Sequence, residues 1–337
     1  MTENTQVENK APERINVLSI DGGGIRGIIP ATILTEIEAR TGKPISQLFD
    51  IVAGTSTGGI LALGFVTPKA PGSTEPAYTG TDMIEMYEKY GKLIFPKRLF
   101  SNFMRIFRPE YPTSGLESML EDYFGDTRLK DALSTVVLTS YDIENRMAFF
   151  FRSSNAKIPK LQSSYDYPMK SAARATSAAP TYFRPAKVPK GVPAGEYWHL
   201  IDGGVFANNP AMCAYVEALG VNPDAEICMV SLGTGTTAPI NYANKADSWG
   251  LVGWARPVVT ITMEAPGTTV DYQLNRLLSA RNYFRIQTRV DEEGAILDNV
   301  EDANMEHLKE LARKTIQDPA ARFEEVCARL LENRQGS

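Results

Sequence analysis

One local pattern occurs twice within the first 66 residues of the chain: an apolar run, a glycine-rich turn and an apolar helix. The run from Ile15 to Ile20 leads into "DGGGIRG", and the segment that follows places Ile29, Ile33 and Ile37 on one helical face. The stretch "FDIVAGTSTGGILALGFV" has the same order of strand, turn and helix. Two successive units of this kind predict an α/β fold with a mostly parallel central sheet between helices.

No linker, repeat or low-complexity block divides the 337 residues. We therefore predict a single domain over residues 14–325, with its motif-bearing core at about 15–215. A polar, flexible tail is expected over residues 1–13. The end of a helix and a short tail are expected over residues 326–337.

The overall charge and the cysteines limit the function classes. A formal net charge of −5 argues against a nucleic-acid partner, which requires a basic surface. The N-terminal stretch has no apolar segment typical of a secretory signal, and the three cysteines lack metal-ligand or disulfide spacing. We therefore predict a cytoplasmic protein with reduced thiols and without a metal ion or a transmembrane helix.

The second turn carries a candidate nucleophile. The segment "GTSTG" from Gly54 to Gly58 is a GxSxG motif between a predicted strand and a predicted helix. This is the setting of a nucleophile elbow, in which flanking glycines permit a tight turn and the serine hydroxyl is exposed above the sheet. We therefore predict Ser56 as the nucleophile.

The first turn fits two interpretations. The backbone amides of Gly22, Gly23 and Gly24 lie where a helix begins and can bind an oxyanion. Arg26 either adds positive charge there or fixes the loop through a carboxylate. The same residues fit the GxGxxG pattern of dinucleotide sites, but the second predicted strand has its acidic residue at its start and lacks one at its end.

A serine nucleophile also needs a proton acceptor, and the chain has only two histidines. His199 lies three residues before Asp202 in a predicted strand, so the two side chains should face opposite sides of the sheet. His307 lies in a charged helix. Asp202 ends its strand at two glycines, so a Ser56–Asp202 dyad is the first mechanism, and a triad of Ser56, Asp202 and His307 is the second.

Five blocks of the sequence resemble those of the patatin-like phospholipases, a family of lipid acyl hydrolases, and occur in that family's order: "SIDGGGIRGIIPATIL", "GTSTGG", "ATSAAPTYF", "DGGVFANNPA" and "SLGTGT". The resemblance implies a three-layer fold and a Ser-Asp dyad without a cofactor. Ser56 would be the nucleophile, Asp202 the base, and Gly22, Gly23, Gly24 and Arg26 the oxyanion loop.

The segment of residues 91–111 combines five Lys or Arg residues with four phenylalanines, Phe95, Phe100, Phe103 and Phe107. Such a combination suits an anionic lipid surface, so we predict a membrane and acyl-pocket face here. In the alternative interpretation, the aromatic rings belong to the core and the cations form a solvated rim.

The predicted activity is hydrolysis of fatty-acyl esters of phospholipids or related polar lipids through an acyl-enzyme. Peripheral contact with a membrane would accompany it. A storage or scaffold protein with residual esterase activity is the alternative, and nucleotide binding at the GxGxxG turn is the third hypothesis.

Overall fold

The computed structural model describes residues 14–96, 111–190, 195–237, 246–248 and 250–332. The strands are β1 (Arg14–Ile20), β2 (Ile51–Gly54), β3 (Thr135–Asp142), β4 (Met147–Arg152), β5 (Ala186–Pro189), β6 (Tyr197–Asp202), β7 (Glu226–Leu232) and β8 (Tyr283–Ile286). The longer helices are α1 (Ile28–Thr41), α3 (Thr57–Val66), α4 (Gly80–Ile94), α5 (Ser114–Phe124), α8 (Met169–Thr176), α10 (Ala211–Val221), α12 (Leu251–Leu277), α13 (Asp302–Gln317) and α14 (Phe323–Leu331). The short ones are η1 (Gly24–Gly27), α2 (Ile45–Leu48), η3 (Leu129–Asp131), α6 (Ser153–Ala156), η4 (Pro159–Leu161), α7 (Gln162–Tyr165), α9 (Gly204–Ala207) and η5 (Pro319–Ala321).

These strands form one sheet in the order β5-β6-β3-β2-β1-β7-β8, with β4 paired to β3. Within the series β3-β2-β1-β7-β8, each pair of adjacent strands is parallel. The pairs that involve β4, β5 and β6 are antiparallel. The prediction of a mostly parallel sheet is therefore confirmed.

Strands β2 and β6 share one edge of β3 and meet there end to end. Strand β4 occupies the opposite edge, along residues 137–142 of β3. Strand β2 stops at Gly54, which pairs with Leu138, and β6 arrives from the other direction and stops at Asp202, which pairs with Ser140. The residues that follow β2 and those at the end of β6 therefore converge, although they are far apart in the sequence.

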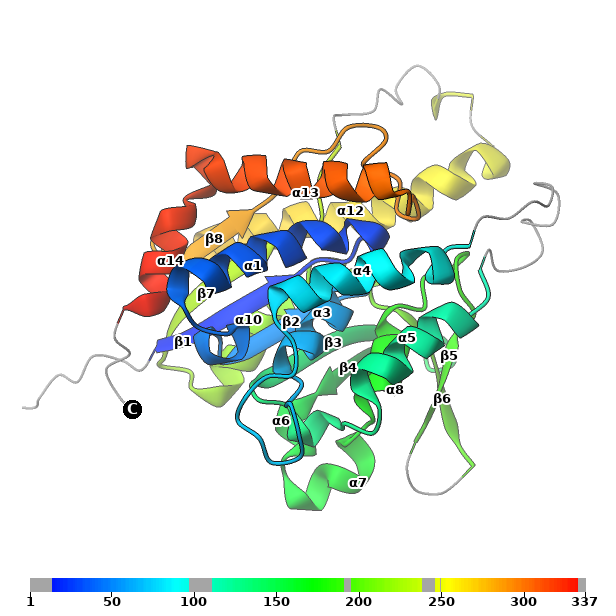
Figure 1. The fold of residues 1–337 in the computed structure, drawn as a ribbon. Coiled ribbons are helices and arrows are strands. Elements are labelled where there is room, and N and C mark those ends of the chain that lie inside the picture. Colours follow the sequence, from blue (N-terminus) through cyan, green and yellow to red (C-terminus); the bar gives the residue numbers. More distant parts are fainter. Residues whose placement is uncertain (1–13, 97–110, 191–194, 238–245, 249, 333–337) are drawn as a thin grey trace, which may run out of the picture.

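Helices cover both faces of the sheet (Figure 1). On one face α1, α3, α4 and α13 pack over the larger core, which buries Leu18 and Val230 of the sheet. On the other face α10 and α12 cover a smaller core, in which Val17 of β1 packs with Ala214 and Leu274. Because side chains alternate along a strand, β1 supplies both cores. The predicted three-layer architecture is confirmed.

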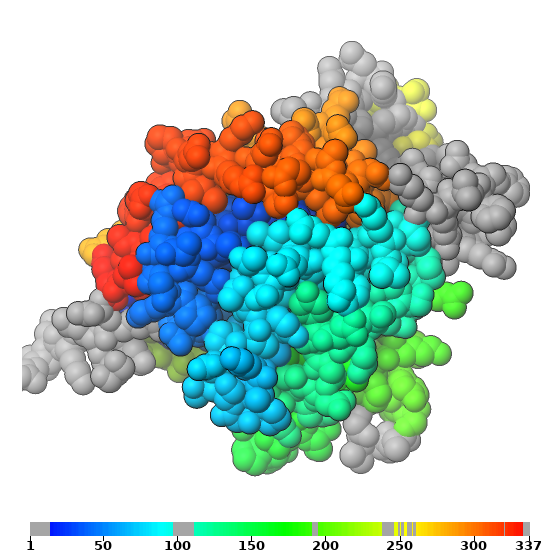
Figure 2. Space-filling model, viewed as in Figure 1, coloured from blue at the N-terminus to red at the C-terminus, as the bar shows by residue number. Residues whose placement is uncertain are grey.

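Helices α4 and α13 meet on the surface of the larger-core side (Figure 2). Lys92 of α4 forms an ion pair with Asp302 at 2.6 Å, and Lys309 of α13 forms one with Glu88 at 2.8 Å. Such exposed pairs each contribute little to stability, typically about 0.2–1 kcal/mol. The two ion pairs nevertheless connect helices that are more than 200 residues apart in the sequence.

The C-terminal helix packs on the same core. Val326, Cys327 and Leu330 of α14 are buried in the larger core. The predicted division at residue 325 thus falls inside a helix whose second half is part of the domain's packing. No helix in the described ranges combines the length and the apolar character that a membrane span requires.

Candidate active site

Ser56 lies on the turn between β2 and α3. Its backbone has φ 55° and ψ −126°, a combination that a residue with a side chain seldom adopts. A Cβ atom on Gly54 would lie 2.2 Å from the Gly58 carbonyl oxygen, and one on Gly58 would lie 2.2 Å from the Ile20 oxygen. The turn needs both glycines because β1, β2 and α3 approach one another there through bare backbone.

Hydrogen bonds hold this strained turn in place. The Ser56 amide donates to Oγ1 of Thr176 in α8 at 2.9 Å. The Ser56 carbonyl accepts from the amides of Gly59 and Ile60 at 2.9 Å and 3.1 Å. The residue as a whole is 8% exposed and lines a cavity. The serine is thus fixed by its backbone at the wall of the cavity.

Asp202 ends β6 and is fully buried. Its Oδ1 accepts a hydrogen bond from the Gly204 amide at 2.7 Å, and its Oδ2 has no hydrogen-bond partner among the described residues. Burial raises the pKa of this carboxyl from 3.8 to about 7, although the Ser56 hydroxyl and the Gly204 amide act to lower it. A carboxyl that interacts with the serine and titrates near neutrality can accept the serine proton.

The glycine loop between β1 and α1 is held on both sides. The Gly22 amide donates to the Asn208 carbonyl at 3.0 Å, and the Gly22 carbonyl accepts from Oγ1 of Thr234 at 2.6 Å. The amides of Gly23 and Gly24 have no hydrogen-bond acceptor in the part of the chain that the structure describes. Of the three amides predicted to face an anion, the Gly22 amide is thus occupied within the fold, and the other two are available.

This loop lies directly against the nucleophile. A Cβ atom on Gly22 would lie 3.2 Å from the Ser56 Cβ. Gly24 has φ 57°, and a Cβ there would lie 2.3 Å from the Leu297 carbonyl oxygen. Gly24 is therefore required both by its conformation and by the close approach of another backbone segment.

Arg26 is buried, with 8% of its surface exposed. Burial lowers the pKa of its guanidinium, and its Nε has no hydrogen-bond partner among the described residues. Within those residues no carboxylate lies at ion-pair distance from it, and Glu264 is the acidic group with the largest electrostatic effect on it. Fixing of the loop by an Arg26–carboxylate pair, one of the two predicted roles, is therefore not seen within the described ranges.

The cavity beside Ser56 has a volume of about 220 Å³ and is largely apolar. Ser56, Asp202, Gly23 and Gly24 line one part of it. Most of the remaining wall comes from α4, α5, α12 and the segment after α8, with lining side chains that include Met86, Ile94, Leu116, Met119, Phe183 and Met263. A cavity of this kind suits an apolar chain next to a few polar groups.

Of the four phenylalanines predicted to form a membrane and acyl-pocket face, Phe95 lines the cavity. Its ring packs edge-on against Tyr111 at 5.2 Å and tilted against Phe183 at 5.9 Å. Phe100, Phe103 and Phe107 lie outside the described residues.

Neither histidine is among the residues that line the cavity. His199 lies 2.8 Å from Glu144, beside the turn between β3 and β4. His307 lies 2.9 Å from Asp291, to which it is hydrogen-bonded. The described side chains also include no group of three or more His, Cys, Asp or Glu that could hold a metal ion. Among the described residues that line the cavity with the predicted nucleophile, Asp202 is the one with a carboxyl group.

Thr176, Asn208 and Thr234 support the site, and sequence reasoning did not find them. Each lies inside one of the blocks that carry the family resemblance. Their partners are backbone atoms of Ser56 and Gly22, at separations of 120 to 212 residues. Their position in these blocks indicated a family-related role. No local sequence pattern could predict which backbone atoms they would bond to.

A strained serine, a buried carboxyl and two available backbone amides thus lie around one apolar cavity in an α/β fold, an arrangement that suits a hydrolase with a serine nucleophile. The sequence profile of the patatin-like phospholipases matches residues 18–215. The chain belongs to this family of lipid acyl hydrolases, which confirms the predicted family.

Relatives with similar sequences span nearly the whole chain. Patatin-like protein 2 of Oryza sativa is 30% identical over 94% of this chain and 88% of its own length. Patatin-T5 of Solanum tuberosum is 32% identical over 96% of this chain and 91% of its own. A probable inactive patatin-3-Kuras 1 of the same species is 33% identical over 82% and 79%.

Proposed function

We propose that this chain hydrolyses fatty-acyl esters of phospholipids or related polar lipids with a Ser56–Asp202 dyad. One observation carries the proposal: the strained serine and the buried carboxyl line the same apolar cavity. The apolar wall suits an acyl chain, and the two polar groups suit its ester bond.

In the first half-reaction, the Ser56 hydroxyl attacks the ester carbonyl carbon while its proton passes to Asp202. The carbonyl oxygen becomes an oxyanion, which the Gly23 and Gly24 amides bind, with Arg26 nearby as positive charge. The bond to the alcohol then breaks, and Asp202 returns the proton to the departing oxygen. The lysolipid leaves, and the fatty acid stays as an ester on Ser56.

In the second half-reaction, Asp202 takes a proton from water, whose oxygen attacks the acyl-enzyme carbonyl. The ester bond to Ser56 then breaks, the serine oxygen regains the proton, and the fatty acid is released. A base with a pKa of about 7 suits both steps near neutral pH, because it is partly ionised and still basic enough to accept a proton.

A storage or scaffold role is the second candidate, since one relative is itself named a probable inactive patatin. It predicts a folded protein whose lipid turnover stays near background. Nucleotide binding at the glycine loop is disfavoured, because the Gly22 amide is already bonded to Asn208. Titration with NAD and ATP tests that hypothesis.

We also propose a cytoplasmic protein that contacts membranes through residues 91–111. A double variant, Phe100→Glu with Phe103→Glu, should lose binding to anionic vesicles and keep its hydrolysis of a soluble ester. Equal loss of both properties would contradict this proposal.

The decisive experiment measures fatty-acid release from mixed phospholipid vesicles. Ser56→Ala and Asp202→Asn should abolish release, whereas the double variant His199→Ala/His307→Ala should retain it. If the folded histidine variant were also inactive, the triad would replace the dyad. If the wild type and Ser56→Ala released fatty acid equally slowly, from vesicles and from soluble esters, the scaffold role would be favoured.

A further inference from the structure

A buried ion pair lies directly beside the glycine loop, outside the residues assigned so far. The Arg285 guanidinium donates two hydrogen bonds to the carboxylate of Asp21, from Nη1 to Oδ1 at 3.0 Å and from Nη2 to Oδ2 at 2.6 Å. Nη1 also donates to Ser231 Oγ at 2.9 Å. The Arg285 and Asp21 side chains are 16% and 7% exposed. A bidentate contact of this kind fixes the relative orientation of the two side chains as well as their distance.

Strand pairing brings these groups together. Arg285 of β8 pairs with Ser231 of β7, and Ser231 pairs with Ser19 of β1. Asp21 lies two residues after Ser19, so its side chain points to the same face of the sheet. That face is covered by α10 and α12, whereas Ile25 and Ile60 of the cavity wall belong to the core on the other face. Neither Asp21 nor Arg285 is among the residues that line the cavity, so the ion pair adjoins the glycine loop without forming part of the cavity wall.

The ion pair adjoins the start of the glycine loop. Asp21 immediately precedes Gly22, and its amide donates to the Leu232 carbonyl at 3.0 Å. Its side chain is held by Arg285, and the next residue is held by Asn208 and Thr234. The two residues after that carry the amides without an acceptor among the described residues. The direction of these amides thus depends on the anchored residues before them.

We propose that Arg285 is a positioning residue for the reaction: by holding Asp21, it aims the Gly23 and Gly24 amides at the oxyanion formed on Ser56. This inference rests on the proposed function. Displacement of a reacting geometry by about 1 Å can cost about 100-fold in rate, and loss of one oxyanion donor costs about 100- to 1000-fold. The effect should appear in kcat, because the donors act on charge that develops only in the transition state.

The test separates positioning from a merely structural ion pair. Arg285→Gln leaves Asp21 buried without its partner and should lower both the melting temperature and kcat. The double variant Asp21→Asn/Arg285→Gln replaces the ion pair by a neutral pair, so much of the stability should return. We expect its kcat for a soluble p-nitrophenyl ester to stay about 100-fold below the wild-type value, with KM unchanged.

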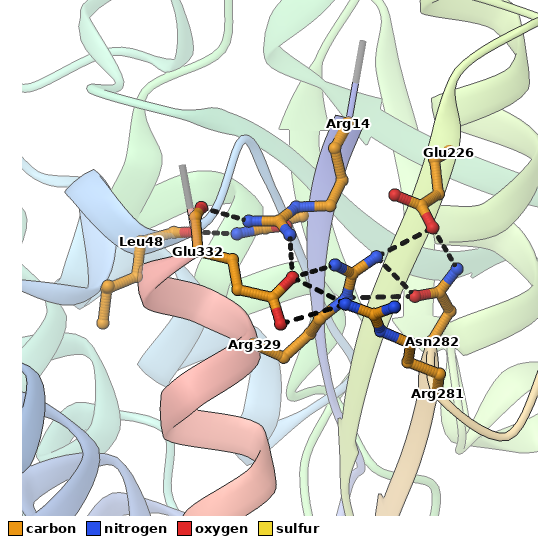
Figure 3. A network of polar contacts seen from close by, with 8 residues as sticks. Arg14, Leu48, Glu226, Arg281, Asn282, Arg329 and Glu332 are labelled. Carbon is orange, nitrogen blue, oxygen red and sulfur yellow. Dashed lines mark hydrogen bonds and ion pairs between the residues drawn. The ribbon is translucent and has the colours of Figure 1, made fainter. Parts of the chain in front are cut away.

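Arg329→Gln is the matched control, at the opposite end of the same strands. Arg329 of α14 is buried and bonded to Glu226, Asn282 and Glu332 near the starts of β7 and β8 (Figure 3). This variant also breaks a buried arginine network on β7 and β8, but it does not touch the glycine loop. It should lower the melting temperature and leave kcat unchanged.

Ser56→Ala is the control that tests the proposed function itself. If Ser56→Ala is inactive and the double variant regains wild-type kcat together with its stability, the pair is structural only and the inference is wrong. If Arg285→Gln does not fold, the kcat and stability of the double variant alone decide between a positioning role and a purely structural role. If Ser56→Ala retains wild-type activity, the proposed function itself fails, and the inference fails with it.

Discussion

The buried carboxyl of Asp202 should cost the protein stability at neutral pH. In the unfolded chain its pKa is near 3.8, and in the folded protein burial raises the pKa to about 7. The folded state therefore holds this proton more tightly, and the free energy of unfolding contributed by this group falls as pH rises from about 4 to about 7. At about 1.4 kcal/mol per pH unit, the loss amounts to about 4 kcal/mol above pH 7.

Asp202→Asn removes the charge and keeps the shape of the side chain. We expect the variant to be inactive and yet to gain stability over the wild type as pH rises, by about 2 kcal/mol between about pH 5 and about pH 7. Urea unfolding of both proteins across this range gives the difference directly. A difference that stayed constant with pH would refute the assigned pKa and its origin in burial.

Asp142→Asn is a matched control at another buried carboxylate. Its Oδ1 accepts from the Glu144 amide at 3.0 Å, and its Oδ2 accepts from Asn145 Nδ2 at 2.6 Å. In asparagine one of these two oxygens becomes an amide nitrogen, which cannot accept the hydrogen bond made there, so this variant should be destabilised at about pH 8, by about 1–3 kcal/mol.

Three further predictions concern the site. Ser56→Gly should be more stable than Ser56→Ala by about 1–3 kcal/mol in urea unfolding, because glycine adopts φ 55° without strain; equal stabilities would contradict this. Gly58→Ala should lower the melting temperature sharply, because its Cβ would lie 2.2 Å from a backbone oxygen, whereas Gly220→Ala, with nothing within 4 Å, should be neutral or stabilising. The pH profile of kcat/KM should rise through about pH 7 as Asp202 ionises, and a flat profile would exclude it as the base.

Helix α12 shows where sequence patterns fail for the fold. It spans 27 residues, yet its sequence contains Gly253, Pro257, Pro266 and Gly267, which normally indicate loops. Packing against α9, α10 and β8 stabilises the helix in spite of these residues. Such tertiary contacts outweigh local propensity, and no pattern in the segment reveals them.

The sequence alone determined the two strand–turn–helix units and the conformation of Ser56. Both follow from neighbours in the chain, since Gly54 and Gly58 permit the turn and apolar periodicity defines the strands and helices. Sequence patterns also identified Asp202 as a residue that ends a strand beside two glycines.

Only the tertiary structure decided what surrounds these residues. The end-to-end meeting of β2 and β6 along β3 brings Asp202 to Ser56, and burial there raises its pKa. Strand order also places Arg285 on Asp21, and the fold occupies the Gly22 amide. Desolvation and hydrogen bonding depend on groups that are close in space and distant in sequence, so topology, and no local pattern, sets the chemistry of the site.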